Sequence, residues 1–112
     1  MDIAIEGLWT VEFGSSTGMF GGGVVVFQGG KILGGDGGYY YTGEYELHGD
    51  TFGATLRIFP FIEGYVSVFR TVGQELTLDL TGVLTPDGRT TAQGHPRGMP
   101  HLKFGAKLTR RA

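Results

Sequence analysis

Hydrophobic and polar residues alternate along several stretches of the chain, and this two-residue period is typical of β-strands with one buried face. The first stretch puts Trp9, Val11 and Phe13 on one face and Leu8, Thr10 and Glu12 on the other. In the next, Tyr39, Tyr41, Gly43, Tyr45 and Leu47 share a face opposite Tyr40, Thr42, Glu44 and Glu46. Further inward sets are expected at Phe52, Ala54, Leu56 and Ile58, at Leu76, Leu78 and Leu80, and at Leu102, Phe104, Ala106 and Leu108.

Turn-forming residues separate these stretches. Gly29-Gly30, His48-Gly49-Asp50 and Pro86-Asp87-Gly88 are typical of hairpin turns. Segments 60–64 and 95–100 are expected to be longer connections, because their prolines cannot donate to a central ladder. We count eight or nine short strands in the 112 residues. Since closure would bury the apolar face, we predict an all-β chain, with residues 1–112 forming a single small closed antiparallel up-and-down barrel.

The composition supports this prediction and limits the chemistry. Among the 112 residues are 22 glycines, and each costs a helix roughly 1 kcal/mol relative to alanine. Glycines inside the predicted strands are expected to relieve crowding where a small barrel bends: Gly21, Gly22, Gly23, Gly43, Gly53 and Gly105. The absence of cysteine excludes disulfides and thiolates. We find no secretory signal and no membrane-spanning segment, and the outward faces carry charges, so we expect a cytoplasmic protein without a membrane partner.

Charge is divided unevenly along the chain. Residues 1–56 hold seven acids and one base, and residues 57–112 hold four acids and eight bases, which gives the net charge of −2. A negative net charge argues against a general nucleic-acid binder. The last 24 residues contain only bases among their charged residues: Arg89, Arg97, Lys103, Lys107, Arg110 and Arg111. These bases either form a face for an acidic partner or lie across the sheet from Glu44, Glu46 and Asp50.

Few residues have the spacing that catalysis or metal binding requires. His95 and His101 are separated by a segment with two prolines and no carboxylate, and no serine occupies a nucleophile elbow. The triple glycine at 21–23 opens no helix that could bind a phosphate. We therefore expect no catalytic residue, no metal and no cofactor. Tyr39, Tyr41 and Tyr45 combine apolar area with a hydroxyl, which suits a core, a ligand cavity or a partner interface.

The N-terminal half resembles a known family. The run Gly30-Lys31-Ile32-Leu33-Gly34-Gly35-Asp36, followed by Tyr41-Thr42-Gly43 and preceded by Gly21 and Gly23, is similar to the GrlR-like family, named after a repressor of type III secretion genes in enteric pathogens. The likeness covers residues 6–47. In this run the glycines at 34 and 35 allow positive φ or close approach, and Asp36 is able to hydrogen-bond the following turn. The family's acidic Glu-Asp-Glu-Asp loop is replaced here by residues 46–50, Glu-Leu-His-Gly-Asp.

The resemblance implies a cytoplasmic, lipocalin-like barrel that forms homodimers and binds a transcriptional activator without catalysis. Gly7-Leu8-Trp9 is similar to the element that opens lipocalin-type barrels, where the tryptophan closes one end beneath a late arginine, here Arg110 or Arg111. For such a regulator, we expect the partner to contact Glu44, Glu46 and Asp50. The alternative is a calycin-type binder of a small apolar ligand, with Gly43, Gly53 and Ala54 leaving room inside the barrel.

Overall fold

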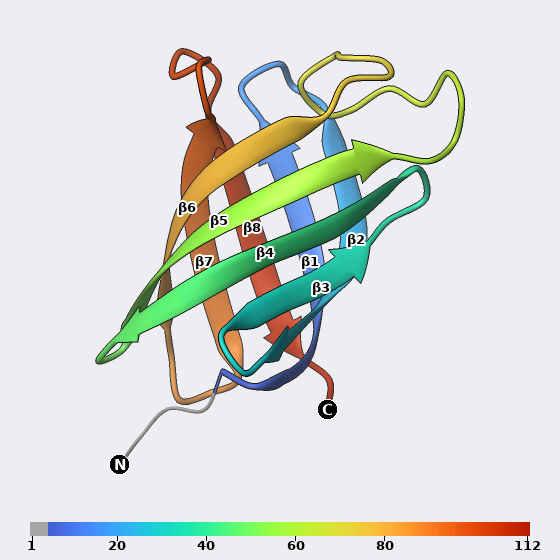
Figure 1. The fold of residues 1–112 in the computed structure, drawn as a ribbon. Coiled ribbons are helices and arrows are strands. Elements are labelled where there is room, and N and C mark those ends of the chain that lie inside the picture. Colours follow the sequence, from blue (N-terminus) through green and yellow to red (C-terminus); the bar gives the residue numbers. More distant parts are fainter. Residues whose placement is uncertain (1–4) are drawn as a thin grey trace.

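Eight antiparallel strands close into a barrel in the computed structural model of the protein, which describes residues 5–112 (Figure 1). Each strand pairs with its neighbours in sequence, and β8 pairs with β1 to close the sheet. The strands are β1 (Gly7–Ser15), β2 (Phe20–Gln28), β3 (Lys31–Gly35), β4 (Tyr39–His48), β5 (Thr51–Pro60), β6 (Leu76–Leu84), β7 (Arg89–Pro96) and β8 (Phe104–Arg110). The predicted all-β, closed up-and-down architecture is confirmed, and it is consistent with a small lipocalin-like barrel.

The predicted alternation decides which side chains fill the barrel. Trp9 and Val11 of β1 are buried, and so are Tyr39 and Tyr41 of β4. The inward sets of the later strands also join one core, which includes Phe52, Leu56, Ile58, Leu76, Leu78 and Leu108. Leu47 departs from the prediction, since its side chain is 44% exposed near the β4–β5 turn. One continuous apolar interior is the result.

Tight turns gather at one end of the barrel, beside the start of β1 and the C-terminus (Figure 1). Gly29 and Gly30 join β2 to β3, and Gly49 and Gly88 lie in the turns after β4 and β6. All four have positive φ, a backbone conformation that glycine adopts without steric cost. The hairpin turns predicted from glycine and proline are therefore present.

Longer connections lie at the opposite end, and two predicted boundaries are wrong. The connection after β5 covers residues 61–75 rather than 60–64, and the one after β7 begins at residue 97 rather than 95. Pro60 and Pro96 are the last residues of their strands, where the ladder ends and a missing N–H costs little. Leu102, expected inside a strand, precedes β8.

The strand glycines divide into crowded and open positions. A Cβ added to Gly43 would lie 3.0 Å from the Cα of Leu56 on β5, so only glycine fits between these backbones. No atom lies within 4 Å of a Cβ added to Gly53 or Gly105. Gly53 and Gly105 therefore do not relieve crowding, contrary to the prediction. Both occupy outward-facing positions of their strands, so Gly53 does not leave room inside the barrel either.

Candidate functional site

A cavity of about 120 Å³ lies inside the barrel and reaches the 61–75 loop at one end. Its wall is mainly aliphatic and aromatic and comes from most of the strands, for example from Val25, Ile32, Leu56, Leu78, Ala106 and Leu108. Such an apolar enclosure offers a ligand burial without competing hydrogen bonds. Gly43 is absent from the lining, whereas Ala54 belongs to it.

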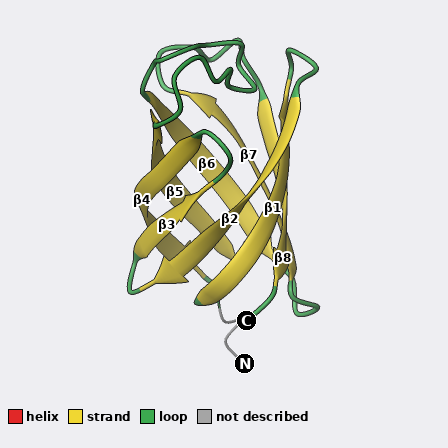
Figure 2. Cartoon of the chain, turned by 90° about the vertical axis from the view of Figure 1, so that its right-hand side faces the viewer, coloured by secondary structure: helices red, strands yellow, loops and turns green. Residues whose placement is uncertain are grey.

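The 61–75 loop covers this end of the barrel and supplies part of the cavity wall (Figure 2). Its tip is a narrow turn in which the Ser67 amide donates to the Thr71 carbonyl at 2.9 Å, and Val66 bridges to Val72. Val68 and Phe69 at this tip are 9% and 5% exposed, although they belong to a loop. The tip is therefore inserted into the mouth of the barrel.

Polar contacts hold the loop tip against the β1–β2 connection. The Val68 carbonyl accepts hydrogen bonds from the hydroxyls of Ser15 and Thr17, at 2.5 and 2.6 Å. The Arg70 guanidinium donates to the Thr17 carbonyl at 3.2 Å. Below them the Phe69 ring lies 5.7 Å from the ring of Phe104 on β8. Only a few hydrogen bonds hold the loop tip in the mouth. Displacing it therefore requires less free energy than separating two paired strands.

One polar corner interrupts the apolar wall of the cavity. The Oδ1 atom of Asp36 accepts hydrogen bonds of 2.9 Å from the amides of Gly38 and Tyr39, and Oδ2 accepts one from the Tyr41 hydroxyl. Burial, followed by the hydrogen bond to Asp36, raises the pKa of Tyr41, and burial also raises the pKa of Tyr39. Both phenols therefore stay neutral at physiological pH.

Trp9 and Arg110 close the far end of the barrel. Trp9 is 1% exposed, and its indole Nε1 donates a 2.8 Å hydrogen bond to the Ile5 carbonyl. Arg110 is the cross-strand neighbour of Trp9, with its guanidinium carbon 4.7 Å from the ring centroid. The contact expected for Arg110 or Arg111 is made by Arg110. The barrel is therefore closed by a buried side chain at this end and by a loop at the other.

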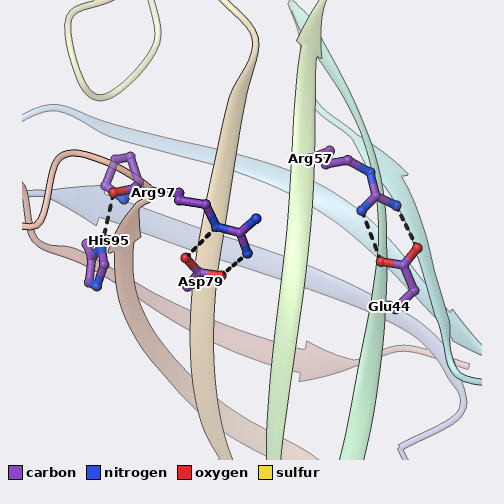
Figure 3. A network of polar contacts seen from close by, with 6 residues as sticks. Glu44, Arg57, Asp79, His95 and Arg97 are labelled. Atoms are coloured by element: carbon purple, nitrogen blue, oxygen red, sulfur yellow. Dashed lines mark hydrogen bonds and ion pairs between the residues drawn. The ribbon is translucent and has the colours of Figure 1, made fainter.

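The predicted partner residues lie on the outer surface of the barrel. Glu44 and Glu46 project from β4, and Asp50 is exposed in the β4–β5 turn. Arg57 of β5 donates two hydrogen bonds to Glu44, of 3.1 and 2.7 Å (Figure 3). This hydrogen bonding is the main reason why the pKa of Glu44 is lowered. Glu46 lies 3.6 Å from the imidazole of His48.

Of the two alternatives for the C-terminal bases, pairing with Glu44, Glu46 and Asp50 is wrong. In an up-and-down barrel β4 has only β3 and β5 as neighbours, so the base of β5, Arg57, reaches Glu44. Arg97 instead pairs with Asp79 of β6 at 2.7 Å, and this contact lowers the pKa of Asp79 (Figure 3). Each pair joins elements that lie beside each other in the closed sheet.

The outer surface carries a hollow of about 990 Å³ across β4 to β7. Small and polar residues line it, among them Gly53, Thr55, Thr81 and Gln93. Glu44, Glu46 and Asp79 contribute acidic groups, and His95 and Lys103 contribute basic ones. Two of the three predicted partner residues, Glu44 and Glu46, are therefore together in one concave surface, whereas Asp50 lies outside it.

The three tyrosines singled out from the sequence have two different environments. Tyr39 and Tyr41 line the cavity, whereas Tyr45 packs against Phe27 of the core, with ring centroids 5.3 Å apart. Sequence reasoning recognised the hydrogen bonds of Asp36 to its turn but missed its position at the cavity, and it missed the loop residues Ser67 and Phe69. The many apolar residues of the 61–75 segment, such as Val68-Phe69, were the available signal.

Within residues 5–112, no three histidine, aspartate or glutamate side chains are grouped closely enough to hold a metal ion. The same part of the chain has no helix with the length and apolar character needed to cross a membrane. Neither a family model nor a curated protein matches the sequence. The resemblance of residues 6–47 to the GrlR-like family therefore stays a prediction.

Proposed function

We propose that this protein is a non-catalytic binding protein whose barrel holds a small, mainly apolar molecule beneath the 61–75 loop. The observation that carries this proposal is the apolar cavity of about 120 Å³ between the strands and the inserted tip residues Val68 and Phe69. An apolar cavity of about 150 Å³ is known to hold benzene. The size therefore suits a molecule with one small ring or a short alkyl chain.

The interior favours such a ligand for two physical reasons. Burial of apolar surface contributes about 25 cal/mol per Å², and the preformed wall loses little conformational freedom when the ligand enters. We expect the loop tip to be the route of entry, because the side chains of Ser15, Thr17 and Arg70 and the packing of Phe69 hold it there rather than a strand ladder. The Trp9 end is closed by a buried indole and offers no comparable route.

Titration with one-ring aromatic probes, beginning with toluene, tests this proposal. We expect NMR shifts at amides around the cavity, such as Val25 and Leu78. Ala106→Leu fills part of the cavity and should abolish the shifts, whereas Thr91→Val on the exposed face of β7 should preserve them. Circular dichroism checks that both variants are folded. Absence of shifts with every probe, or equal binding by Ala106→Leu, would overturn the proposal.

We infer a second candidate function from the outer hollow. Its acids Glu44 and Glu46, near the exposed Asp50, are suited to bind a basic protein surface. This supports the proposal of a cytoplasmic regulator that sequesters such a protein. A transcriptional activator is the partner class that the GrlR-like resemblance implies. The pairing of Glu44 with Arg57 reduces the negative charge available there, so the ligand-binding proposal has the stronger geometric support.

The resemblance also leads us to propose a homodimer. The opposite charges of the two halves of the chain permit an isologous contact between an acidic region of one copy and a basic region of the other. Light scattering at low salt and high protein concentration should then give twice the chain mass of 12.0 kDa. A monomer mass under those conditions would contradict the dimer.

A further inference from the structure

The polar corner of the cavity has unused hydrogen-bonding capacity. Asp36 accepts three hydrogen bonds, from the Gly38 and Tyr39 amides and from the Tyr41 hydroxyl. A carboxylate offers about four lone-pair positions, so about one acceptor position of Asp36 is left for a ligand. Asp36 belongs to the lining of the cavity, which places this capacity where a ligand would lie.

The neighbouring tyrosines add acceptors rather than donors. The single hydroxyl proton of Tyr41 is directed to Asp36, so its oxygen presents lone pairs to its surroundings. The Tyr39 hydroxyl donates toward the loop carbonyls of Tyr65 and Thr71, both at 3.4 Å. A ligand group at this corner therefore needs to be a hydrogen-bond donor.

The electrostatics of the corner favour a positive donor. Within residues 5–112, the ion pairs formed by carboxylates involve Glu44, Glu46 and Asp79, and none involves Asp36. The partly buried Asp36 carboxylate thus lacks a basic partner in the described part of the chain.

We propose that the ligand of the cavity is a small amine whose protonated amino group binds Asp36 and the Tyr41 oxygen, while its apolar part fills the space beneath Phe69. This inference rests on the ligand-binding function proposed above and specifies the chemical class of the ligand. An ammonium group provides both the hydrogen-bond donor and the countercharge for Asp36. A neutral alcohol would provide the donor alone, and a carboxylic acid would be repelled.

Paired binding measurements with benzylamine and toluene at neutral pH test this inference. The two probes share a ring and differ in the amino group, which is protonated near pH 7. We expect benzylamine to bind roughly tenfold or more tightly than toluene, because a charge-assisted hydrogen bond is added. Ala106→Leu should weaken the binding of both probes, and this result would show that both bind in the cavity.

The variants Asp36→Asn and Tyr41→Phe separate the part that these residues play in ligand binding from the part they play in the fold. Asparagine retains an oxygen for the Gly38 and Tyr39 amides but removes the charge, and phenylalanine retains the ring of Tyr41. Asp36→Asn should remove the preference for benzylamine and leave toluene binding nearly unchanged, and Tyr41→Phe should reduce the preference. Glu63→Gln in the 61–75 loop removes one exposed negative charge and should change neither.

The outcomes distinguish the two proposals. Equal affinities for toluene and benzylamine in the wild type, or a preference that persists in both Asp36→Asn and Tyr41→Phe, would overturn the amine inference while the cavity function stands. Failure of both probes to bind would remove the cavity function as well. Thermal unfolding of each variant shows whether the fold is retained, and the Tyr41→Phe result decides the matter where Asp36→Asn fails to fold.

Discussion

Single residues determine how each end of the barrel is closed. Trp9 makes three contacts: its indole donates a hydrogen bond to Ile5, its ring centroid lies 6.2 Å from that of Phe27 in an edge contact, and the guanidinium of Arg110 lies over its ring. Its indole is therefore satisfied in its polar atom and packed on its faces, as a buried tryptophan requires. The mouth has no equivalent residue, because Phe69 reaches it from a loop rather than from a strand.

Trp9→Ala should accordingly destabilise the barrel by about 3–5 kcal/mol, the usual range for deleting a buried aromatic side chain. Denaturant unfolding followed by circular dichroism measures this change. Phe20→Ala is the control, since the Phe20 side chain is 84% exposed and should cost far less. Native tryptophan fluorescence typical of an exposed indole would contradict the burial of Trp9.

Strands and loops differ in how far the sequence determines them. The alternation of residues 8–13 and 39–45 is local, so it predicted the inward faces correctly. The position of Asp36 at the cavity depends on β4 and on the 61–75 loop, and no local pattern contains that information. The partner of Glu44 depended on strand order in the closed sheet, which selects Arg57 over the C-terminal bases.

The two glycines Gly43 and Gly53 offer a test of packing between strands. Gly43→Ala should destabilise the barrel by about 1–3 kcal/mol, because the new methyl group meets the backbone of Thr55 and Leu56. Gly53→Ala meets nothing within 4 Å and should be neutral or stabilise by about 0.4–1 kcal/mol through the unfolded state. Thermal unfolding of both variants measures the contrast, and similar losses in the two would contradict it.

The pairs between neighbouring elements also predict an acid dependence. Arg57 and Arg97 lower the pKa values of Glu44 and Asp79 below the unfolded values of about 4. The stabilisation is therefore complete above the unfolded pKa values and is lost as the pH falls through the lower folded values. Unfolding measured from about pH 6 to pH 2 should show a small loss, because both pairs are exposed. The loss should shrink in a Glu44→Gln, Asp79→Asn variant, and an unchanged profile would contradict this origin.

At the scale of the whole molecule, the two proposed binding functions rest on two separate surfaces, the interior beneath the loop and the outer hollow. Their chemistry differs, because the interior is apolar with one carboxylate, whereas the hollow is polar and contains charges of both signs. The loop and the inner faces of β4 and β5 line the cavity, and the outer faces of the same strands carry Glu44 and Thr55. The alternating strand period thus places both sites on one pair of strands.

If the outer acids guide a basic partner, their removal should slow association more than it changes stability. We expect the variant Glu44→Gln, Glu46→Gln, Asp50→Asn to bind a partner captured from the host more slowly, with a difference that fades as salt screens charges beyond about 8–10 Å. Its melting temperature should stay nearly unchanged, since exposed charges contribute little to stability. The control Glu12→Gln, Glu63→Gln, Glu75→Gln changes the net charge equally at other exposed positions. Equal association rates in the two variants would contradict a role for the β4 acids and shift attention to the basic β8 strand, whereas a selective effect would separate the outer surface from the cavity.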